Sequence, residues 1–158
     1  MPQATALIDG NNFYASCEQS LDPSLIGRPV VVLSNNDGCI VARSAEARAL
    51  GIAMGTPYFK ARRELQRQNV VVRSSNYALY ADMSQRMMAV LEAHCEDLEI
   101  YSIDEAFGRM SRPHDGDLQS WARGLRARVR RDLGLPIAIG LGASKGQAKL
   151  ANRLAKRV

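Results

Sequence analysis

The chain has 158 residues, a hydrophobic content of 46% and a formal net charge of +5. This length fits one domain, or one compact domain that carries a smaller insertion. No window reaches the apolar length of a membrane span, and the N-terminus lacks the charged and apolar regions of a secretory signal, so we expect a cytoplasmic protein without membrane attachment. The three widely spaced cysteines fit neither a disulfide framework nor a zinc site.

The charge is divided unevenly along the chain. Residues 1–110 hold 10 Lys and Arg against 13 Asp and Glu, whereas residues 111–158 hold 11 against 3. A basic C-terminal part is typical of proteins that contact a polyanion such as nucleic acid. A solvated basic helix face would give the same composition, so the charge alone leaves both interpretations open.

The first half of the chain alternates short strand and helix patterns. An apolar run predicts a first strand that ends at Asp9, and β-branched runs bounded by turn residues predict further strands. In chain order, the predicted elements are strand 4–8, helix 13–18, loop 21–29, strand 30–33, turn 34–38, strand 39–42, helix 45–50, helix 60–67 and strand 70–72.

The second half begins with a long helical pattern, whose methionines are better explained as core than as a cofactor site. The predicted elements are helix 77–96, strand 98–103, a hairpin partner that begins at 106–107 and is interrupted at 111–116, helix 118–133, strand 136–141 and helix 145–157. This order predicts an α+β fold, with a ferredoxin-like sheet that has its helices on one side and a small α/β insertion.

Carboxylates follow two of these strands at the point where each strand ends. Asp9 closes the first strand, and Asp104 with Glu105 closes a later one. Unpaired carboxylates are costly at the ends of buried strands, and their hard oxygens suit Mg²⁺. Two such strands at one sheet edge would hold two Mg²⁺ ions for phosphoryl or nucleotidyl transfer, with the Gly10 carbonyl as a further ligand. Taken alone, an Asp-Glu pair is more often a surface charge at a strand end.

Four side chains could bind the rest of a nucleotide. We assign Tyr14 to the sugar, where a ring against C2′ would exclude a 2′-hydroxyl, and Phe13 to the core, although it also counts as a nucleotide-binding candidate. Arg48 could contact a phosphate with both guanidinium nitrogens, and Arg43 is a weaker candidate. An exposed ion pair with Glu46 is the alternative for Arg48.

The last predicted helix carries a basic stripe. Its pattern lacks the GK[ST] of a P-loop. Four like charges on one stripe repel one another, and a triphosphate or a DNA backbone would relieve that repulsion. The stripe residues are Lys145, Lys149, Arg153 and Lys156.

Four segments of the chain resemble Y-family translesion DNA polymerases, and their amino-acid sequences are most similar to those of the UmuC-type members. The segments are 9–18 (DGNNFYASCE), 30–39 (VVVLSNNDGC), 75–84 (SNYALYADMS) and 101–107 (YSIDEAF). The resemblance covers nearly the whole chain. It implies a palm domain at 1–13 and 79–158, fingers at 14–78, and thumb and little-finger domains that would follow Val158 and are absent from this sequence.

The resemblance implies template-directed addition of deoxynucleotides (dNTPs) to a primer 3′-OH with two Mg²⁺ ions, in DNA damage tolerance and SOS mutagenesis. Its implied partners are primer–template DNA, dNTP, a UmuD-type subunit, a recombinase filament and the sliding clamp. Together with the basic stripe, it assigns Asp9, Asp104, Glu105 and Gly10 to the metals, Tyr14 to a steric gate, Phe13, Arg43, Arg48 and Lys156 to the nucleotide, and Lys145, Lys149 and Arg153 to DNA.

Two other functions remain open from the sequence. The chain could be a catalytically silent fragment that binds nucleotide or partner proteins. A nucleotide cyclase with a similar sheet would carry a GGDEF-like signature, which the sequence lacks. One departure from the family concerns residues 108–110, where many members have a Leu-Asp-like pair and this chain has Gly-Arg-Met, which leaves the hairpin strand and its outer face in question.

Overall fold

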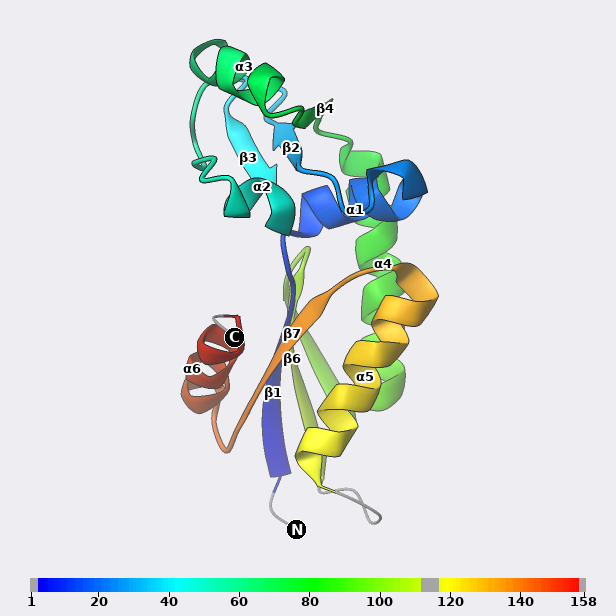
Figure 1. The fold of residues 1–158 in the computed structure, drawn as a ribbon. Coiled ribbons are helices and arrows are strands. Elements are labelled where there is room, and N and C mark those ends of the chain that lie inside the picture. Colours follow the sequence, from blue (N-terminus) through cyan, green and yellow to red (C-terminus); the bar gives the residue numbers. More distant parts are fainter. Residues whose placement is uncertain (1–2, 112–116, 157–158) are drawn as a thin grey trace. The chain divides into compact units, whose positions relative to one another are not determined.

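The structure is a computed structural model that describes residues 3–111 and 117–156. The chain divides into two compact units (Figure 1). Residues 1–11 and 81–158 form the sheet unit, and residues 12–80 form the insertion unit. The boundaries that we expected, after residues 13 and 78, differ from these by two residues each. No helix in the described part of the chain combines the length and the apolar character that a membrane span requires.

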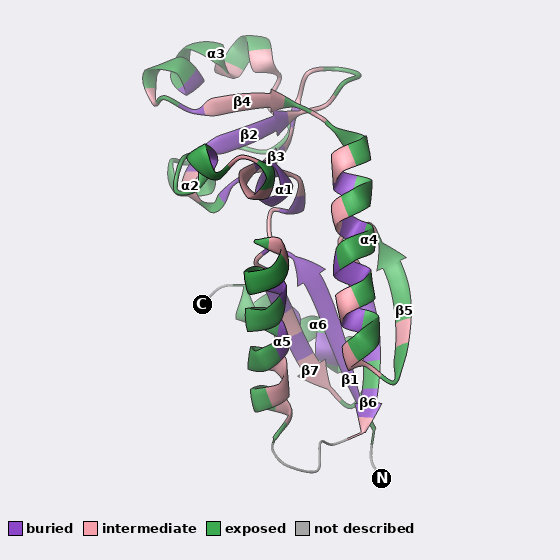
Figure 2. Cartoon of the chain, turned by 90° about the vertical axis from the view of Figure 1, so that its right-hand side faces the viewer, coloured by how far each residue is buried: buried purple, intermediate pink, exposed green. Residues whose placement is uncertain are grey.

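The sheet unit is built on four antiparallel strands in the order β5-β6-β1-β7. Strand β1 lies inside the sheet and is buried over seven of its eight residues, which explains its almost uninterrupted apolar sequence (Figure 2). Strand β5 forms an exposed edge. The strand bounds are β1 Gln3–Gly10, β5 Asp97–Ser102, β6 Glu105–Ser111 and β7 Ile137–Gly142.

Strand β6 continues through the residues that depart from the family pattern. A Cβ atom at Gly108 would lie 2.6 Å from the Sγ of Cys95, so this position has room only for glycine unless Cys95 moves. Arg109 points to solvent and pairs in register with Thr5 of β1. The hairpin strand is therefore present, paired with β1 on one side and with β5 on the other, with a register shift near Ile100. The predicted interruption at 111–116 falls largely on residues 112–116, which lie outside the described residues.

Three helices pack on the sheet, and their ends match the capping residues. Asp117 accepts a hydrogen bond from the Ser120 N–H at the start of α5, and Gly134 ends that helix with a positive φ of 67°. Ser144 caps α6 through the Gln147 N–H. The helix bounds are α4 Tyr77–His94, α5 Leu118–Leu133 and α6 Lys145–Ala155; the first four residues of α4 belong to the insertion unit.

The expected α+β class is confirmed, but the helices cover both faces of the sheet and not one. Helices α5 and α6 lie on opposite sides of the strands (Figure 1). Helix α6 approaches β7 closely: a Cβ atom at Gly140 would lie 2.1 Å from the Asn152 nitrogen, and one at Gly142 would lie 2.7 Å from the Ala148 nitrogen. The glycines of β7 therefore make the second helical layer possible.

The insertion unit contains a second sheet, in the order β3-β2-β4, with β2 antiparallel to β3 and parallel to β4. A short 3-10 helix, Pro23–Leu25, lies in the segment expected to be a loop. The core of the insertion unit is apolar and includes Val31, Ile40 and Leu65. The remaining bounds are α1 Phe13–Leu21, β2 Val30–Leu33, β3 Ile40–Arg43, α2 Ala45–Ala49, α3 Tyr58–Arg67 and β4 Val71–Ser74.

Candidate active site

Three carboxylates lie at one end of the strands of the sheet unit, in a region that we call the acidic edge: Asp9, Asp104 and Glu105. Asp9 is the last side chain of β1 and lies opposite Glu105 in the antiparallel register of β1 and β6. Directly opposed residues project from the same face of a sheet. Asp104 occupies the tight connection between β5 and β6, where its carbonyl accepts a hydrogen bond from the Gly10 N–H at 2.8 Å.

Two serines hold the turn that carries Asp104. The Ser102 hydroxyl donates to Asp104 Oδ1 at 3.0 Å and fixes the direction of that carboxylate. The hydroxyl of Ser84, which is buried in α4, donates to the carbonyl of Ile103. The connection is therefore tied to the helix beneath it as well as to the neighbouring strand.

The acidic edge concentrates negative charge in a poorly solvated place. Asp9 is only 7% exposed. Its burial raises its pKa, an effect opposed by Lys156 and Asn152 and reinforced by the charge of Asp104. Burial also raises the pKa of Glu105, and the charges of Asp9 and Asp104 add to it. A bound cation would remove this mutual repulsion.

Helix α6 supplies a counter-charge and a buried amide to Asp9. The Lys156 ammonium contacts Asp9 Oδ2. One turn earlier, the amide of Asn152 donates to the carbonyls of Leu7 and Ala138 at 3.0 Å each and lies 3.5 Å from Asp9 Oδ1. Asn152 is 3% exposed, so these bonds tie α6 to β1 and β7 at the level of the acidic edge.

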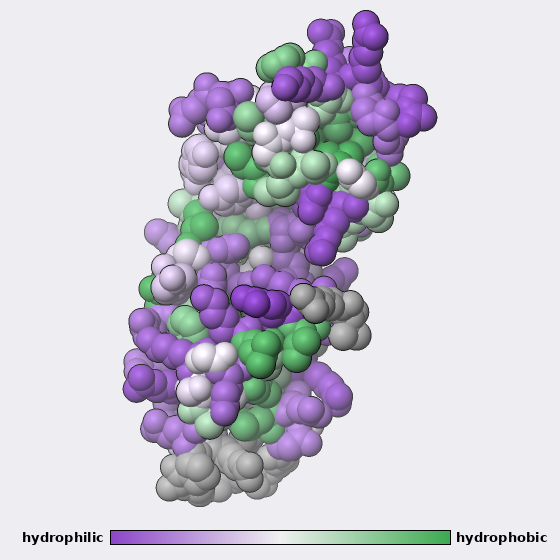
Figure 3. All heavy atoms as spheres, turned by 90° about the vertical axis from the view of Figure 1, so that its left-hand side faces the viewer, coloured by the Kyte–Doolittle hydropathy of each residue, from purple (hydrophilic) through white to green (hydrophobic). Residues whose placement is uncertain are grey.

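The rest of the basic stripe borders the same sheet face. Lys145 pairs with Glu99 of β5 at 2.6 Å, and its ammonium lies 5.2 Å from the centre of the Phe107 ring. Lys149 is exposed, and its charge opposes the rise in the pKa of Glu105. Arg153 is also exposed. Figure 3 looks from the side of α6 and shows many hydrophilic side chains there, beside a smaller hydrophobic patch.

Among residues 3–111 and 117–156, no group of three or more His, Cys, Asp or Glu side chains is arranged to hold a metal ion. The chemistry of the acidic edge still fits a divalent cation. Its donors are carboxylate oxygens, and the charge of Asp104 raises the pKa of both Asp9 and Glu105. A metal bound to Asp9 would take the place that the Lys156 ammonium holds.

Within the insertion unit, Tyr14 and Phe13 begin α1. Phe13 is buried, in agreement with its assignment to the core. Tyr14 is half-buried and stacks on Tyr80, with ring centres 4.5 Å apart and an interplanar angle of 14°. The side chain of Tyr14 is therefore held in one orientation by a parallel aromatic neighbour.

The two candidate phosphate ligands of the insertion unit differ in their freedom. The Arg43 guanidinium donates to the carbonyl of Ile52 and is half-buried. Arg48 lies exposed in the last turn of α2 and belongs to none of the ion pairs within the described part of the chain. The expected alternative partner, Glu46, accepts a hydrogen bond from Gln19 at 3.0 Å. Arg48 is the better placed of the two to bind an anion.

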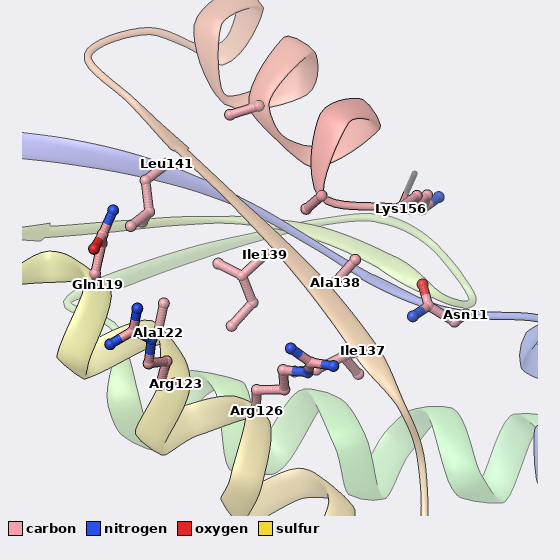
Figure 4. A pocket seen from close by; sticks show the side chains of 12 residues that line it. Asn11, Gln119, Ala122, Arg123, Arg126, Ile137, Ala138, Ile139, Leu141 and Lys156 are labelled. Carbon is pink, nitrogen blue, oxygen red and sulfur yellow. The ribbon is translucent and has the colours of Figure 1, made fainter. Parts of the chain in front are cut away.

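A cavity of about 530 Å³ opens beside β7 in the sheet unit (Figure 4). Its apolar wall contains Ile137, Ile139 and Leu141, and Arg123 and Arg126 of α5 border it. Lys156 is the only residue that it shares with our candidate site residues, and none of the three carboxylates lines it. The cavity therefore differs in place from the acidic edge.

Comparison with known proteins identifies the family. The model of the impB/mucB/samB family matches residues 8–153. The chain belongs to this family. Its matched segment includes Asn152 and all three residues of the acidic edge.

Relatives of this impB/mucB/samB chain include the protein UmuC of Salmonella typhimurium strain LT2, which is 53% identical over 153 residues. That match covers 96% of this chain and 36% of UmuC. DNA polymerase IV of Corynebacterium diphtheriae is 37% identical over 153 residues, covering 94% and 34% of the two chains. The chain thus spans about a third of the length of these relatives.

Solved structures share the fold of this family member. DinB from Sulfolobus solfataricus superposes with a TM-score of 0.82 at 25% identity, over 96% of this chain and 45% of that chain. The insertion ternary complex of Dbh DNA polymerase superposes with a TM-score of 0.85 at 25% identity, over 96% and 46%. The fold of this chain is thus that of the corresponding part of Y-family DNA polymerases.

Sequence reasoning missed several residues that support the site. Asn152 was passed over because it stands within a helix face counted as Ala and Leu, although an amide on a packing face is a signal of buried hydrogen bonds. Ser84 and Ser102 lie in two of the segments that carry the resemblance, but their bonds to Ile103 and Asp104 are seen only in the structure. Glu18 and Tyr80 both lie in matched segments, but only the structure shows that they bond to each other.

Proposed function

We propose that this chain forms the catalytic part of a translesion DNA polymerase, which adds dNTPs to a primer 3′-OH during DNA damage tolerance. The observation that carries the proposal is the acidic edge, where Asp9 and Glu105 face each other across β1 and β6 and Asp104 stands in the adjoining turn. The names of the relatives, which include DNA polymerase IV, support the same reaction.

The acidic edge would hold two Mg²⁺ ions through Asp9, Asp104, Glu105 and the Gly10 carbonyl. When bound, such ions lower the pKa of the attacking 3′-hydroxyl and neutralise the charge of the triphosphate. Ser102 would keep Asp104 directed toward them, since its hydroxyl already donates to that carboxylate.

We assign further basic side chains to the incoming nucleotide and to DNA, each within its own unit. Lys156 would leave Asp9 and bind a phosphate of the dNTP, because a metal bound to Asp9 would replace the Lys156 ammonium as the counter-charge of that carboxylate. Arg48, with Arg43 as a lesser contributor, would bind further phosphate oxygens. We assign Lys145, Lys149 and Arg153 to the DNA backbone, because they border the same sheet face as the acidic edge.

In the insertion unit, we assign roles at the nucleotide to two aromatic residues. Tyr14 would act as a steric gate against the 2′-hydroxyl of ribonucleotides, and its stacked, half-buried ring supports that role. Phe13 would support Tyr14 from the core, since its ring centre lies 6.2 Å from that of Tyr14.

The cellular setting is part of this proposal. We infer a role in SOS mutagenesis in the cytoplasm, with a UmuD-type subunit, a recombinase filament and the sliding clamp as partners. The similarity to UmuC supports this setting.

One observation favours a second function, that of a nucleotide- or protein-binding fragment without catalysis. Asp9 is already paired with Lys156, and the described residues include no group that is arranged to hold a metal. A chain that keeps this pair in the presence of Mg²⁺ and dNTP would bind its ligand and not turn it over.

Single-nucleotide primer extension separates the two functions. The 158-residue chain is incubated at low salt with Mg²⁺, a primer–template and one dNTP, beside an Asp104→Asn variant and a matched Asp82→Asn variant, whose carboxylate only pairs with Arg86. Under the first proposal, we expect extension by the wild type and by Asp82→Asn, and none by Asp104→Asn. Extension that survives in Asp104→Asn would refute the metal mechanism, and no extension by a folded wild type that binds dNTP would favour the second function.

A further inference from the structure

The insertion unit contains a buried carboxylate that the metal site does not use. Glu18 of α1 is 7% exposed and accepts a hydrogen bond from the Tyr80 hydroxyl at 2.8 Å. A carboxylate is costly to bury, so a fold that buries one needs a compensating bond. A phenol–carboxylate bond is charge-assisted and therefore stronger than a bond between neutral groups.

Tyr80 joins two positions on α1. Its ring stacks on Tyr14, and its hydroxyl reaches Glu18, four residues later on the same side of the helix. Its own position is fixed, because it is fully buried and its N–H donates to the Asn76 carbonyl at 3.1 Å. Burial raises the pKa of Tyr80 above its ordinary range, so the hydroxyl stays protonated and can donate.

Tyr77 closes the edge of the same stack. Its ring meets Tyr14 at an interplanar angle of 89° and Tyr80 at 81°, with ring centres 6.2 and 6.1 Å away. Edge-to-face contacts of this kind are favourable aromatic geometries. The Tyr14 ring thus stacks on Tyr80 and makes an edge contact with Tyr77, and rotation of the ring would break both contacts.

We infer that Glu18 and Tyr80 are positioning residues, which hold the Tyr14 ring in place and thereby set how strongly the enzyme discriminates against ribonucleotides. The inference rests on the proposed role of Tyr14 as the steric gate. A gate excludes a hydroxyl group only if its ring cannot yield, and the Glu18–Tyr80 bond prevents Tyr80, and with it Tyr14, from moving aside.

The position of the ring can be tested without activity. The five tyrosines are replaced by 3-fluorotyrosine, and the ¹⁹F resonance of Tyr14 is assigned with Tyr14→Phe. We expect this resonance to move in Glu18→Leu and Tyr80→Phe, and to move further in Tyr80→Leu, which removes the stack. Tyr58→Phe is the matched control, because Tyr58 packs on a different core cluster of the same unit, and it should leave the resonance in place.

The consequence is tested by primer extension with dATP and with ATP opposite thymine. We expect Tyr80→Leu to lower the preference for dATP by about two- to tenfold, the factor that corresponds to one aromatic pair, and Tyr80→Phe to lower it less. The ratio for Tyr58→Phe should equal that of the wild type. Urea unfolding of each variant confirms that it is folded before its ratio is compared.

The outcomes separate the inference from the proposed function. If Tyr14→Ala gains ATP use while the Tyr80 and Glu18 variants do not, the gate exists and the positioning role is refuted. If Tyr14→Ala leaves the preference unchanged, the steric gate is refuted. If no variant extends the primer, the ¹⁹F spectra alone decide whether Tyr80 and Glu18 hold the ring: an unmoved Tyr14 resonance in all three variants would refute it.

Discussion

The ammonium of Lys156 contacts Asp9 Oδ2, although the two residues are 147 positions apart in the sequence. The Asp9 side chain is 10% exposed and that of Lys156 is 41% exposed, so the pair lies where the interior of the sheet unit meets solvent. Lys156, which we assign to the triphosphate, thus neutralises Asp9, which we assign to the metals. The counter-charge of Asp9 can therefore be supplied by Lys156 or by a bound cation.

We expect Lys156→Ala to destabilise the chain by about 1–2 kcal/mol in EDTA, because Asp9 loses its counter-charge while half of the pair stays solvated. Saturating Mg²⁺ should reduce this deficit, because it stabilises the variant more than the wild type. Urea unfolding with and without Mg²⁺ measures both effects. Lys60→Ala is a matched control, since Lys60 is an exposed lysine in a helix of the other unit. An equal Mg²⁺ response of wild type and Lys156→Ala would contradict the exchange.

Gly140 and Gly124 should respond in opposite directions to substitution by alanine. A Cβ atom at Gly140 meets backbone atoms of α6 at 2.1 and 2.2 Å, so Gly140→Ala should cost about 3 kcal/mol or more, or separate α6 from the sheet. Nothing lies within 4 Å of a Cβ atom at Gly124 in α5, so Gly124→Ala should gain about 0.5–1 kcal/mol. Equal unfolding midpoints for the two variants would show that α6 does not pack closely on β7.

The cap of α5 should make stability depend on pH. The N–H of Ser120 donates to Asp117 and holds its pKa below the usual range, so the folded state binds fewer protons than the unfolded chain. The stabilisation is thus present above the unfolded pKa of about 3.8 and is lost as the pH falls through the lower folded value. We expect Asp117→Ala to be less stable than wild type at pH 7 and equal to it at strongly acidic pH. Unfolding curves between pH 7 and pH 2 check this, and a difference that stays constant would contradict it.

Cys95 should react slowly with alkylating reagents in the folded chain. Burial raises its pKa to about 11, so roughly one thiol in a thousand is ionised at pH 8. Iodoacetamide labelling followed by peptide mass spectrometry should modify Cys95 slowly in buffer and rapidly in urea. Rapid modification under native conditions would show that the packing of Cys95 against Gly108 opens readily.

Much of the sheet unit could be predicted from the sequence, because apolar alternation and runs mark its strands. The sequence placed Glu105 at the end of a strand, whereas in the structure it begins β6. Because β6 is antiparallel to β1, its first residue pairs with Asp9 near the end of β1, and the two carboxylates come together. The hairpin strand through Gly108 stayed in question, since the fit of a glycine against Cys95 depends on a residue thirteen positions away.

Other features depend on three-dimensional packing that no local pattern specifies. The layer formed by α6 follows from the close approach of Gly140 and Gly142, and two glycines in a strand can equally signal a bulge or a weak strand. We expected Lys156 to bind a triphosphate. In the structure it pairs with Asp9, and the position of Lys156 in the helical pattern does not distinguish a contact with Asp9 from a contact with a ligand. The bond between Glu18 and Tyr80 joins residues 62 positions apart, and neither residue type reveals its partner.

The most direct test of the account is a crystal structure of this chain with primer–template, a non-hydrolysable dNTP and Mn²⁺, recorded with anomalous scattering. We predict two anomalous peaks at about 2.2 Å from carboxylate oxygens of Asp9, Asp104 and Glu105, with Lys156 moved from Asp9 to a phosphate. Density that shows dNTP bound, no anomalous peak at the acidic edge and Lys156 still on Asp9 would contradict the proposed metal site.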